Sequence, residues 1–232
     1  MAAIQSIQSA SDPCDLLGCL FQATWAFGAQ ESACVHVVPD PERATKLMVL
    51  LACDAEQAYA RMHRGTSPDH PWLRYARDHV EPVLASTLSD CNRLQDEADQ
   101  LGLQFDSILI VPTHSGGSTG RFGALLLDTT KPNGAASVDL PSYRVIAHSL
   151  ARELHDWWVR RTRTELQNAA RLRSEDLRLL ALERQGMSTK QIARLVDTSI
   201  TAVDSRFQRI NAKMGTANRR HAALRAAIHE LL

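Results

Sequence analysis

Residues 187–215, MSTKQIARLVDTSITAVDSRFQRINAKMG, carry the pattern that most restricts how this chain can fold. Two short amphipathic stretches, each opened by a serine that suits a helix N-cap, flank a three-residue break at 196–198. In the second stretch, apolar side chains recur every three or four residues, which places them on one stripe of an α-helix. That stripe comprises Val203, Phe207, Ile210 and Met214. The segment therefore predicts two helices that meet across a tight turn and each bury one face.

The side of the second helix opposite this stripe is predicted to be uncharged. It carries the small or hydrogen-bonding residues Thr201, Ser205, Gln208 and Ala212. Arg206, Arg209 and Lys213 gather on one flank, where cations can meet phosphates, and the uncharged face can approach base edges in a major groove. Asp204 lies on the other flank, where an acid can accept a hydrogen bond from a cytosine amino group. We expect the DNA contacts to be Lys190, Ser199, Thr201, Asp204, Ser205, Arg206, Gln208, Arg209 and Lys213.

Charge is distributed unevenly along the chain. The 26 Lys/Arg and 26 Asp/Glu residues cancel overall, which by itself argues against a polyanionic partner. Residues 171–232, however, hold 12 Lys/Arg against 6 Asp/Glu, and residues 1–170 hold 14 against 20. This asymmetry predicts a small basic module beside an acidic one, and 232 residues are enough for two domains.

Helix signals continue on both sides of the opening motif. Ser174, followed by two acids, is expected to cap a helix that stops at Gly186, and Asn218 is expected to cap a closing helix. The helix after Ser188 is expected to face inward with Ile192, Ala193 and Leu195. Four helices of this kind could also form a generic bundle whose charged residues only interact with solvent at its surface. The tight helix-turn-helix spacing, the uncharged outer face and the local positive charge favour a DNA-binding module instead.

The first 166 residues alternate strand-like and helix-like stretches, as in an α/β/α sandwich built on an antiparallel sheet. Strands are predicted at about 32–38, 46–53, 105–113 and 121–129. Helices are predicted at about 11–29, 54–64, 72–80, 91–101 and 142–165. The Gly-rich HSGGSTG between the last two strands lacks the ending of a phosphate-binding loop, and a strand follows it. We expect an α+β chain with a sandwich domain at 1–166, a linker at 167–173, and a four-helix domain at 174–232 whose helix-turn-helix spans about 188–214.

The stretches GMSTKQIARLV, SITAVDSRFQRINAKMG and ANRRHAALRAA resemble the LuxR/GerE-type helix-turn-helix family over about 60 residues without a gap. They match the family's glycine, Ile-Ala, serine, valine and Lys-Leu positions and its closing helix. Four residues depart from the usual pattern: Asp176, Ala202, Asp204 and Arg206. The resemblance implies a transcription regulator that binds double-stranded DNA as a homodimer. The surfaces expected to dimerise are the helices at 142–166 and 218–230.

Two stretches of the first domain, DHPWLRYARDHVEPVLAS and ILIVPTHSGGSTGRFGALLL, resemble the acyl-homoserine-lactone-binding domain of quorum-sensing LuxR proteins. That family fixes its ligand with a buried aspartate and a tryptophan, but His70 and Ala85 stand at these places here, with Asp69 next to the first. The resemblance implies a small-molecule effector, either an acyl-homoserine lactone held differently or another signal. The pocket residues expected are Trp25, Tyr59, Asp69 and Trp72.

Several other classes of function lack support in the sequence. The five cysteines form no CxxC pair and no Cys/His cluster with metal-ligand spacing, so we expect reduced thiols, no metal and no cofactor. No secretory signal and no run of about 18 apolar residues is visible, so we expect a cytoplasmic protein that does not enter a membrane. No nucleophile–base constellation is apparent, so we expect no enzyme activity. The alternative is an orphan regulator or interaction protein, whose first domain binds another protein and no ligand.

Overall fold

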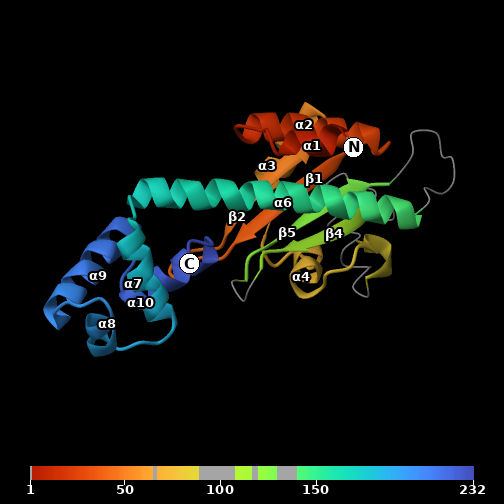
Figure 1. The fold of residues 1–232 in the computed structure, drawn as a ribbon. Helices are drawn as coiled ribbons and strands as arrows, with labels where there is room; N and C mark the ends of the chain where they lie inside the picture. The colour runs from red at the N-terminus through yellow and green to blue at the C-terminus, as the bar shows by residue number, and fades with distance from the viewer. Residues whose placement is uncertain (1, 65–66, 89–107, 117–119, 130–139) are drawn as a thin grey trace. The chain divides into compact units, whose positions relative to one another are not determined.

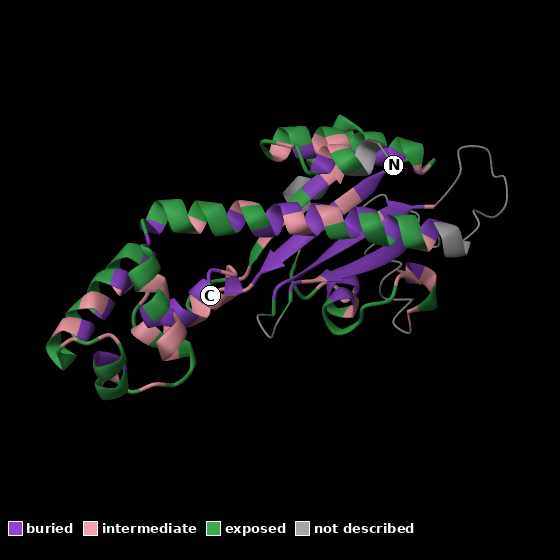
Figure 2. Cartoon of the chain, viewed as in Figure 1, coloured by how far each residue is buried: buried purple, intermediate pink, exposed green. Residues whose placement is uncertain are grey.

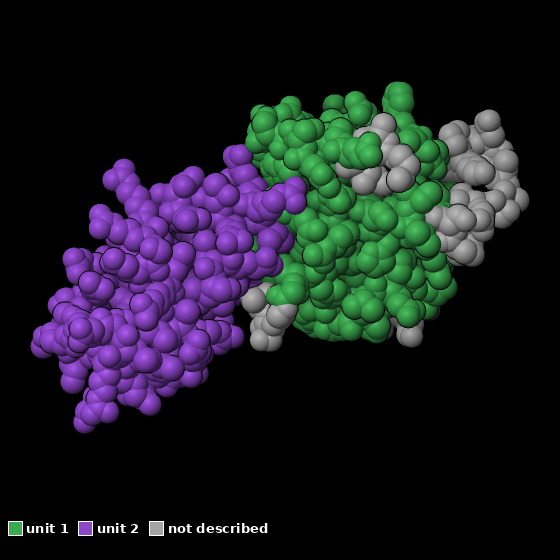
Figure 3. All heavy atoms as spheres, in the orientation of Figure 1, with its two compact units in different colours: residues 1–38, 46–116, 120–157 green, residues 39–45, 117–119, 158–232 purple. Residues whose placement is uncertain are grey.

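The chain folds into two compact units, which Figure 3 shows in separate colours. The computed structural model describes residues 2–64, 67–88, 108–116, 120–129 and 140–232. The first unit holds a β-sheet with its covering helices, and the second consists mainly of residues 158–232. The expected α+β class, a sandwich with an antiparallel sheet followed by a helical domain, is confirmed. The helix expected at 91–101 lies outside the described residues.

The first unit is built on a five-stranded antiparallel sheet with the order β2-β1-β5-β4-β3. Four strands fall where apolar, β-branched runs predicted them, and β4 and β5 pair on either side of the Gly-rich segment. The two-residue β3 was not expected, because so short a strand leaves no periodic signal. The strands are β1 (Ser32–Val38), β2 (Lys46–Ala52), β3 (Val83–Leu84), β4 (Ile108–His114) and β5 (Phe122–Asp128).

Helices cover both faces of this sheet, as Figure 1 shows. On one face, Val35 and Val37 of β1 pack against Leu73 and Ala76 of α4. Because strand side chains alternate between faces, the neighbouring positions of β1 point the other way, toward α2 and α6. The hydroxyls of Thr24 in α2 and of β1's Ser32 lie 2.6 Å apart on that second face. The helices of this unit are α1 (Ala2–Ile7), α2 (Pro13–Ala26), α3 (Ala55–Arg64), α4 (Pro71–Asp78), the 3₁₀ turn η1 (Ala85–Thr87) and most of α6 (Leu140–Ala170).

Helix α6 is longer than expected and corrects the proposed linker. It continues to Ala170, so only residues 171–173 separate it from the next helix. The stretch at 159–170 contains no glycine or proline and is rich in Arg, Glu, Gln and Ala, which sustain a helix even where no core covers them. Despite its length, α6 is not apolar enough to span a membrane, and no other helix of the described residues is long and apolar enough to do so.

The second unit contains four helices around one apolar core, and Figure 2 shows the buried stripe along each. Ser188, Ser199 and Asn218 cap their helices as expected, through hydrogen bonds to backbone N–H groups. Ser174 does not, because α7 already begins at that residue. Leu195 was expected to face inward but is 52% exposed, at the residue where α8 ends. The helices are α7 (Ser174–Arg184), α8 (Thr189–Leu195), α9 (Ile200–Met214) and α10 (Arg219–Ile228).

Gly123 on β5 offers a direct test of how closely its neighbours in the sheet and on α6 pack around it. A Cβ atom at this position would lie 2.9 Å from the backbone oxygen of Val35 and 3.1 Å from His155 Nδ1 of α6. Because the Val35 oxygen belongs to a paired strand, it cannot move aside cheaply, and Gly123→Ala should lower the free energy of unfolding by about 1–3 kcal/mol. Gly18→Ala is the matched control, because a Cβ there meets nothing within 4 Å inside α2.

Urea unfolding of the two variants would measure this difference. The control should unfold at the same or higher urea concentration than the unmodified chain, since alanine gains up to about 1 kcal/mol over glycine within a helix. Equal midpoints for Gly123→Ala and the unmodified chain would show that the surroundings of Gly123 have room for a methyl group.

Candidate nucleic-acid interface

Helix α9 presents the face that the sequence predicted. Val203, Phe207, Ile210 and Met214 are buried, with exposed fractions of 4% or less. The uncharged residues on the opposite side are all exposed: Thr201, Ser205, Gln208 and Ala212. In a regular helix the side opposite a buried stripe points away from that core, and here nothing in the described unit covers it. This strip is therefore available to a partner that approaches the second unit.

The start of α9 is held by its own side chains. Ser199 Oγ accepts a hydrogen bond from the N–H of Ala202 at 3.1 Å and lies 3.0 Å from the hydroxyl of Thr201. Ser199 thus has the capping role expected of it, and its expected contact with DNA stays a prediction. Lys190 and Asp204 are both exposed, on α8 and on α9 respectively. The cap leaves the first turn of α9 ordered and its polar side chains outward.

The three cations expected along one flank of α9 have different surroundings. Lys213 Nζ donates to Asp176 Oδ2 at 2.8 Å and to the carbonyl of Arg171 at 3.2 Å, so it holds the start of α7 against α9. Burial acts to raise the pKa of Asp176, but the Lys213 ammonium and the Arg173 N–H outweigh it and hold the pKa below its usual value. Asp176 is thus ionised and forms an ion pair with Lys213. The sequence predicts a phosphate contact for this lysine.

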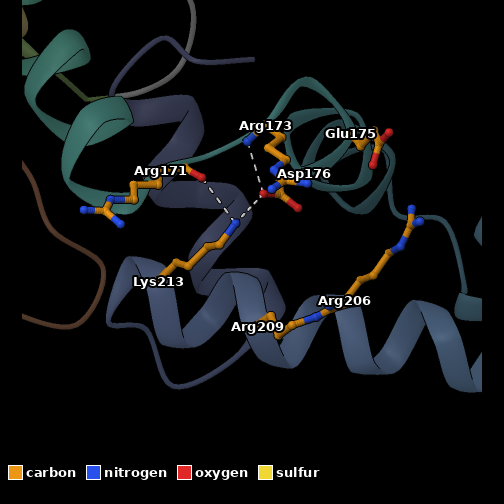
Figure 4. Close-up of a pocket in the computed structure, with 7 residues that line it drawn as sticks. All are labelled: Arg171, Arg173, Glu175, Asp176, Arg206, Arg209 and Lys213. Atoms are coloured by element: carbon orange, nitrogen blue, oxygen red, sulfur yellow. Dashed lines mark hydrogen bonds and ion pairs between the residues drawn. The ribbon is translucent and has the colours of Figure 1, made fainter.

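Arg206 and Arg209 instead line a hollow of about 430 Å³ between α9 and the turn that enters α7 (Figure 4). Neither guanidinium forms a hydrogen bond or an ion pair with another described residue. We call this the basic hollow. Its lining has five basic and two acidic residues: Arg171, Arg173, Glu175, Asp176, Arg206, Arg209 and Lys213.

Arg171 and Arg173 were missed at the sequence level, because they lie in a segment assigned to the linker. The turn is set by a left-handed backbone at Arg171, with φ of 47°, and by Leu172, which is only 8% exposed. The alternation of Arg, Leu and Arg at 171–173 was the available signal, since a buried leucine directs its two neighbours outward. In Figure 4 the Arg171 side chain points away from Lys213, so its carbonyl rather than its guanidinium faces the hollow.

Two further arginines of the unit, Arg219 and Arg225, form internal contacts. Arg219 pairs with Glu183 at 3.1 Å and lies over the ring of Phe207, 5.6 Å from its centroid. Arg225 Nη1 donates to the carbonyl of Met214 at 2.8 Å. These arginines hold α10 against α7 and α9. These two arginines therefore contribute to the packing of the unit, unlike Arg206 and Arg209 on the flank of α9.

The four pocket residues expected in the first unit do not converge. Trp25 on α2 is 77% exposed and Tyr59 on α3 is 66% exposed, while Trp72 on α4 is only 2% exposed. Trp25 and Trp72 also lie on helices that cover opposite faces of the sheet, so they cannot line one cavity. Asp69 is exposed in the turn before α4. Of the four, only Trp72 lies in an apolar interior, where it packs with Ala85, Ile108 and Ile110.

A chain of buried polar groups joins the sheet to α6 inside the first unit. His36 on β1 and His155 on α6 face each other, with their Nδ1 atoms 3.1 Å apart. The Arg121 guanidinium donates through Nε to His36 Nε2 at 3.1 Å, and His155 Nε2 lies 3.0 Å from Ser115 Oγ. His36, Arg121 and His155 are each at most 2% exposed. This cluster was not predicted, because its members are far apart along the chain.

The direction of these hydrogen bonds bears on whether Ser115 could be an activated nucleophile. An arginine only donates, so His36 Nε2 accepts and the His36 proton lies on Nδ1. His36 then donates to His155 Nδ1, which leaves the His155 proton on Nε2, directed at Ser115. A general base must instead offer a lone pair to the hydroxyl that it deprotonates. The cluster is therefore arranged as a cross-link between sheet and helix, and not as a catalytic serine–histidine pair.

Solved structures share this fold at low sequence identity. The structure of SdiA in complex with octanoyl-rac-glycerol matches with a TM-score of 0.75 and 12% identity, covering 98% of this chain and 92% of that one. A crystal structure of Escherichia coli SdiA in the space group P6522 matches with a TM-score of 0.76 and 13% identity, covering 99% of this chain and 96% of that one. Identities this low establish a common fold and leave function to be argued from the residues.

A third structure matches part of the chain. It is CepR2 from Burkholderia cenocepacia, described as an N-acylhomoserine lactone dependent LuxR family transcription factor. The TM-score is 0.53 at 15% identity, and the match covers 69% of this chain and 92% of that one. No protein-family model and no curated protein sequence matches the chain.

The polar cluster makes the stability of the first unit depend on pH. Burial, with the positive charges of Arg121, Arg152 and His114, lowers the pKa of His155 to about 3. A free histidine titrates near 6.5, so below that pH the unfolded chain takes up a proton that the folded chain excludes. This group should not affect the free energy of unfolding above about pH 6.5. The free energy should then fall by about 1.4 kcal/mol per pH unit toward pH 3.

Urea unfolding at pH 7 and pH 5, followed by tryptophan fluorescence, would measure this loss. The variant His155→Gln should lose less stability between the two values than the unmodified chain. His148→Gln is the matched control, because His148 is exposed on the same helix and should leave the pH dependence unchanged. If His155→Gln keeps the full pH dependence, the buried neutral histidine is not its source.

Proposed function

We propose that the chain is a transcription regulator that binds double-stranded DNA and reads its major groove with α9. The observation that carries this proposal is the exposed, uncharged strip of α9 beside unpaired guanidinium groups. A strip with no charged side chain can approach base edges without burying an unpaired charge away from water. The cations on one flank can meet the backbone that borders the groove.

The outer strip of α9 holds the residue types that discriminate bases. Gln208 can pair with an adenine through two hydrogen bonds, and the hydroxyls of Thr201 and Ser205 can donate or accept. Asp204 can accept from a cytosine amino group at the edge of the strip. Thr201, Asp204 and Ser205 lie in the first half of α9, the part of a recognition helix that contacts base edges in helix-turn-helix proteins, and Gln208 lies just past its midpoint.

The regulator is proposed to act as a homodimer. One helix-turn-helix reads few base pairs, and two copies on adjacent half-sites raise both affinity and specificity. Helices α6 and α10 remain the surfaces proposed for this contact. A dimer would place two α9 helices in successive major grooves, about one helical turn of roughly 34 Å apart.

The first unit is proposed to bind a small molecule with an apolar chain, as in a quorum-sensing regulator. Two observations support this: the fold is shared with structures whose descriptions name octanoyl-rac-glycerol or an N-acylhomoserine lactone, and the α4 face of the sheet is apolar around Trp72. Binding would act by shifting the population between arrangements of the DNA-reading units. The exposure of Trp25, Tyr59 and Asp69 favours one alternative, in which the first unit binds another protein and no ligand.

The DNA-binding proposal is tested with duplexes selected from a random library by the full-length chain. Arg209→Ala should weaken binding to all selected duplexes alike, because a phosphate contact carries no sequence information. Ser205→Ala should mainly relax preference at one base position, by about 1–3 kcal/mol. Arg184→Ala is the control, because Arg184 is exposed at the end of α7 and does not line the basic hollow. If both test variants kept wild-type affinity and selectivity, α9 would not be the helix that contacts the bases.

The ligand proposal is tested by thermal unfolding with octanoyl-rac-glycerol and with N-octanoyl homoserine lactone. A ligand that binds only the folded chain adds about 2.7 kcal/mol of stability at a hundredfold excess over its Kd, so the Tm should rise by several degrees. Native mass spectrometry of the purified chain would show whether a small molecule is already bound. An unchanged Tm with both compounds and no bound molecule would favour the protein-binding alternative.

A further inference from the structure

We infer that the basic hollow is a phosphate-binding site in which Arg173 faces Arg206 and Arg209, and that it holds a backbone phosphodiester of the DNA duplex. The choice of DNA as the source rests on the proposed function. The hollow itself is defined by the structure, with one wall from α9 and the other from the turn before α7 (Figure 4). Arg173 would thereby join the interface from outside the helix-turn-helix.

The arginine side chains of the basic hollow carry positive charge that favours the binding of an anion. The guanidinium groups of Arg173, Arg206 and Arg209 form no hydrogen bond or ion pair with any other described residue. Lys213 and Asp176 neutralise each other at 2.8 Å, which leaves Glu175 as the remaining acid of the lining. Three guanidinium groups against one carboxylate give a local excess of positive charge. Concentrating cations in this way is unfavourable unless an anion or solvent compensates.

The walls of the hollow are fixed before any ligand arrives. Lys213 Nζ donates to the Arg171 carbonyl at 3.2 Å, and Asp176 accepts from the Arg173 backbone N–H at 3.1 Å. Leu172 is buried between them in the core of the unit. These contacts hold the backbone of Arg173 opposite α9. Its guanidinium forms no hydrogen bond or ion pair with another described residue, and its charge contributes to lowering the pKa of Asp176. A preformed site loses less conformational entropy on binding than one that must assemble.

A phosphate group suits this site better than a carboxylate or a base. A guanidinium offers a planar fork of donors that matches two oxygens of a phosphate, and a phosphate can accept from several arginines at once. Arg206 and Arg209 also lie on the flank of α9 that borders the outer strip. A duplex whose groove receives this strip would bring its backbone toward the same flank.

The test is the salt dependence of duplex binding by the full-length chain with Arg173→Gln. Each phosphate neutralised contributes about 0.9 to the slope of log affinity against log salt concentration, so the variant should lose about one unit of slope and about tenfold in affinity at low salt. Preference among duplexes should not change. Arg178→Gln is the matched control, because Arg178 is exposed on α7, outside the hollow, and its loss removes the same charge.

A second arm measures binding of inorganic tripolyphosphate to the same variants by calorimetry. A reduced slope for Arg173→Gln but not for Arg178→Gln supports a duplex phosphate in the hollow. An unchanged slope, with tripolyphosphate bound by the unmodified chain and not by Arg173→Gln, keeps the phosphate site but overturns DNA as its source. If Arg173→Gln changes neither the slope nor the binding of tripolyphosphate, the hollow binds no phosphate. If the unmodified chain binds no duplex at all, the proposed function fails and the tripolyphosphate arm alone decides on the site.

Discussion

The burial of one stripe of α9 determines what the C-terminal unit presents to a partner. Val203, Phe207, Ile210 and Met214 are covered by the core that the other three helices supply. Since helical geometry ties each buried position to an exposed one opposite, Ser205 and the other members of the outer strip have no freedom to turn inward. The caps at Ser199 and Asn218 and the left-handed backbone at Gly215 fix where the helices begin and end. The face proposed to read DNA is thus a consequence of hydrophobic packing.

Basic residues around α9 have two different kinds of surroundings. Lys213, Arg219 and Arg225 make internal contacts that hold the helices together. Arg206 and Arg209, on the border of the outer strip, form no ion pair with any residue that the structure describes. A count of basic residues along the sequence does not distinguish these two groups. The distinction matters because a guanidinium group without an ion pair has its full charge available to a phosphate.

Periodicity predicted most of the fold, and it failed where the backbone departs from a regular helix or strand. The strands, the caps at Ser188 and Ser199 and the stripe of α9 all follow from repeats of two or of three to four residues. Arg173 was missed because the turn at Arg171 has a left-handed backbone that composition does not reveal. The pocket residues in the first unit were chosen by residue type and resemblance, without knowledge of which sheet face each helix covers. Trp25 and Trp72 consequently proved to lie on helices of opposite layers.

Dimethyl sulfate footprinting of a selected duplex tests the central claim most directly, because this reagent methylates guanine N7 in the major groove and adenine N3 in the minor groove. If α9 enters the major groove, the bound chain should protect guanine N7 at two sites about one helical turn apart and leave adenine N3 between them reactive. Protection of adenine N3 alone, or a bound complex with every guanine N7 still reactive, would contradict the account.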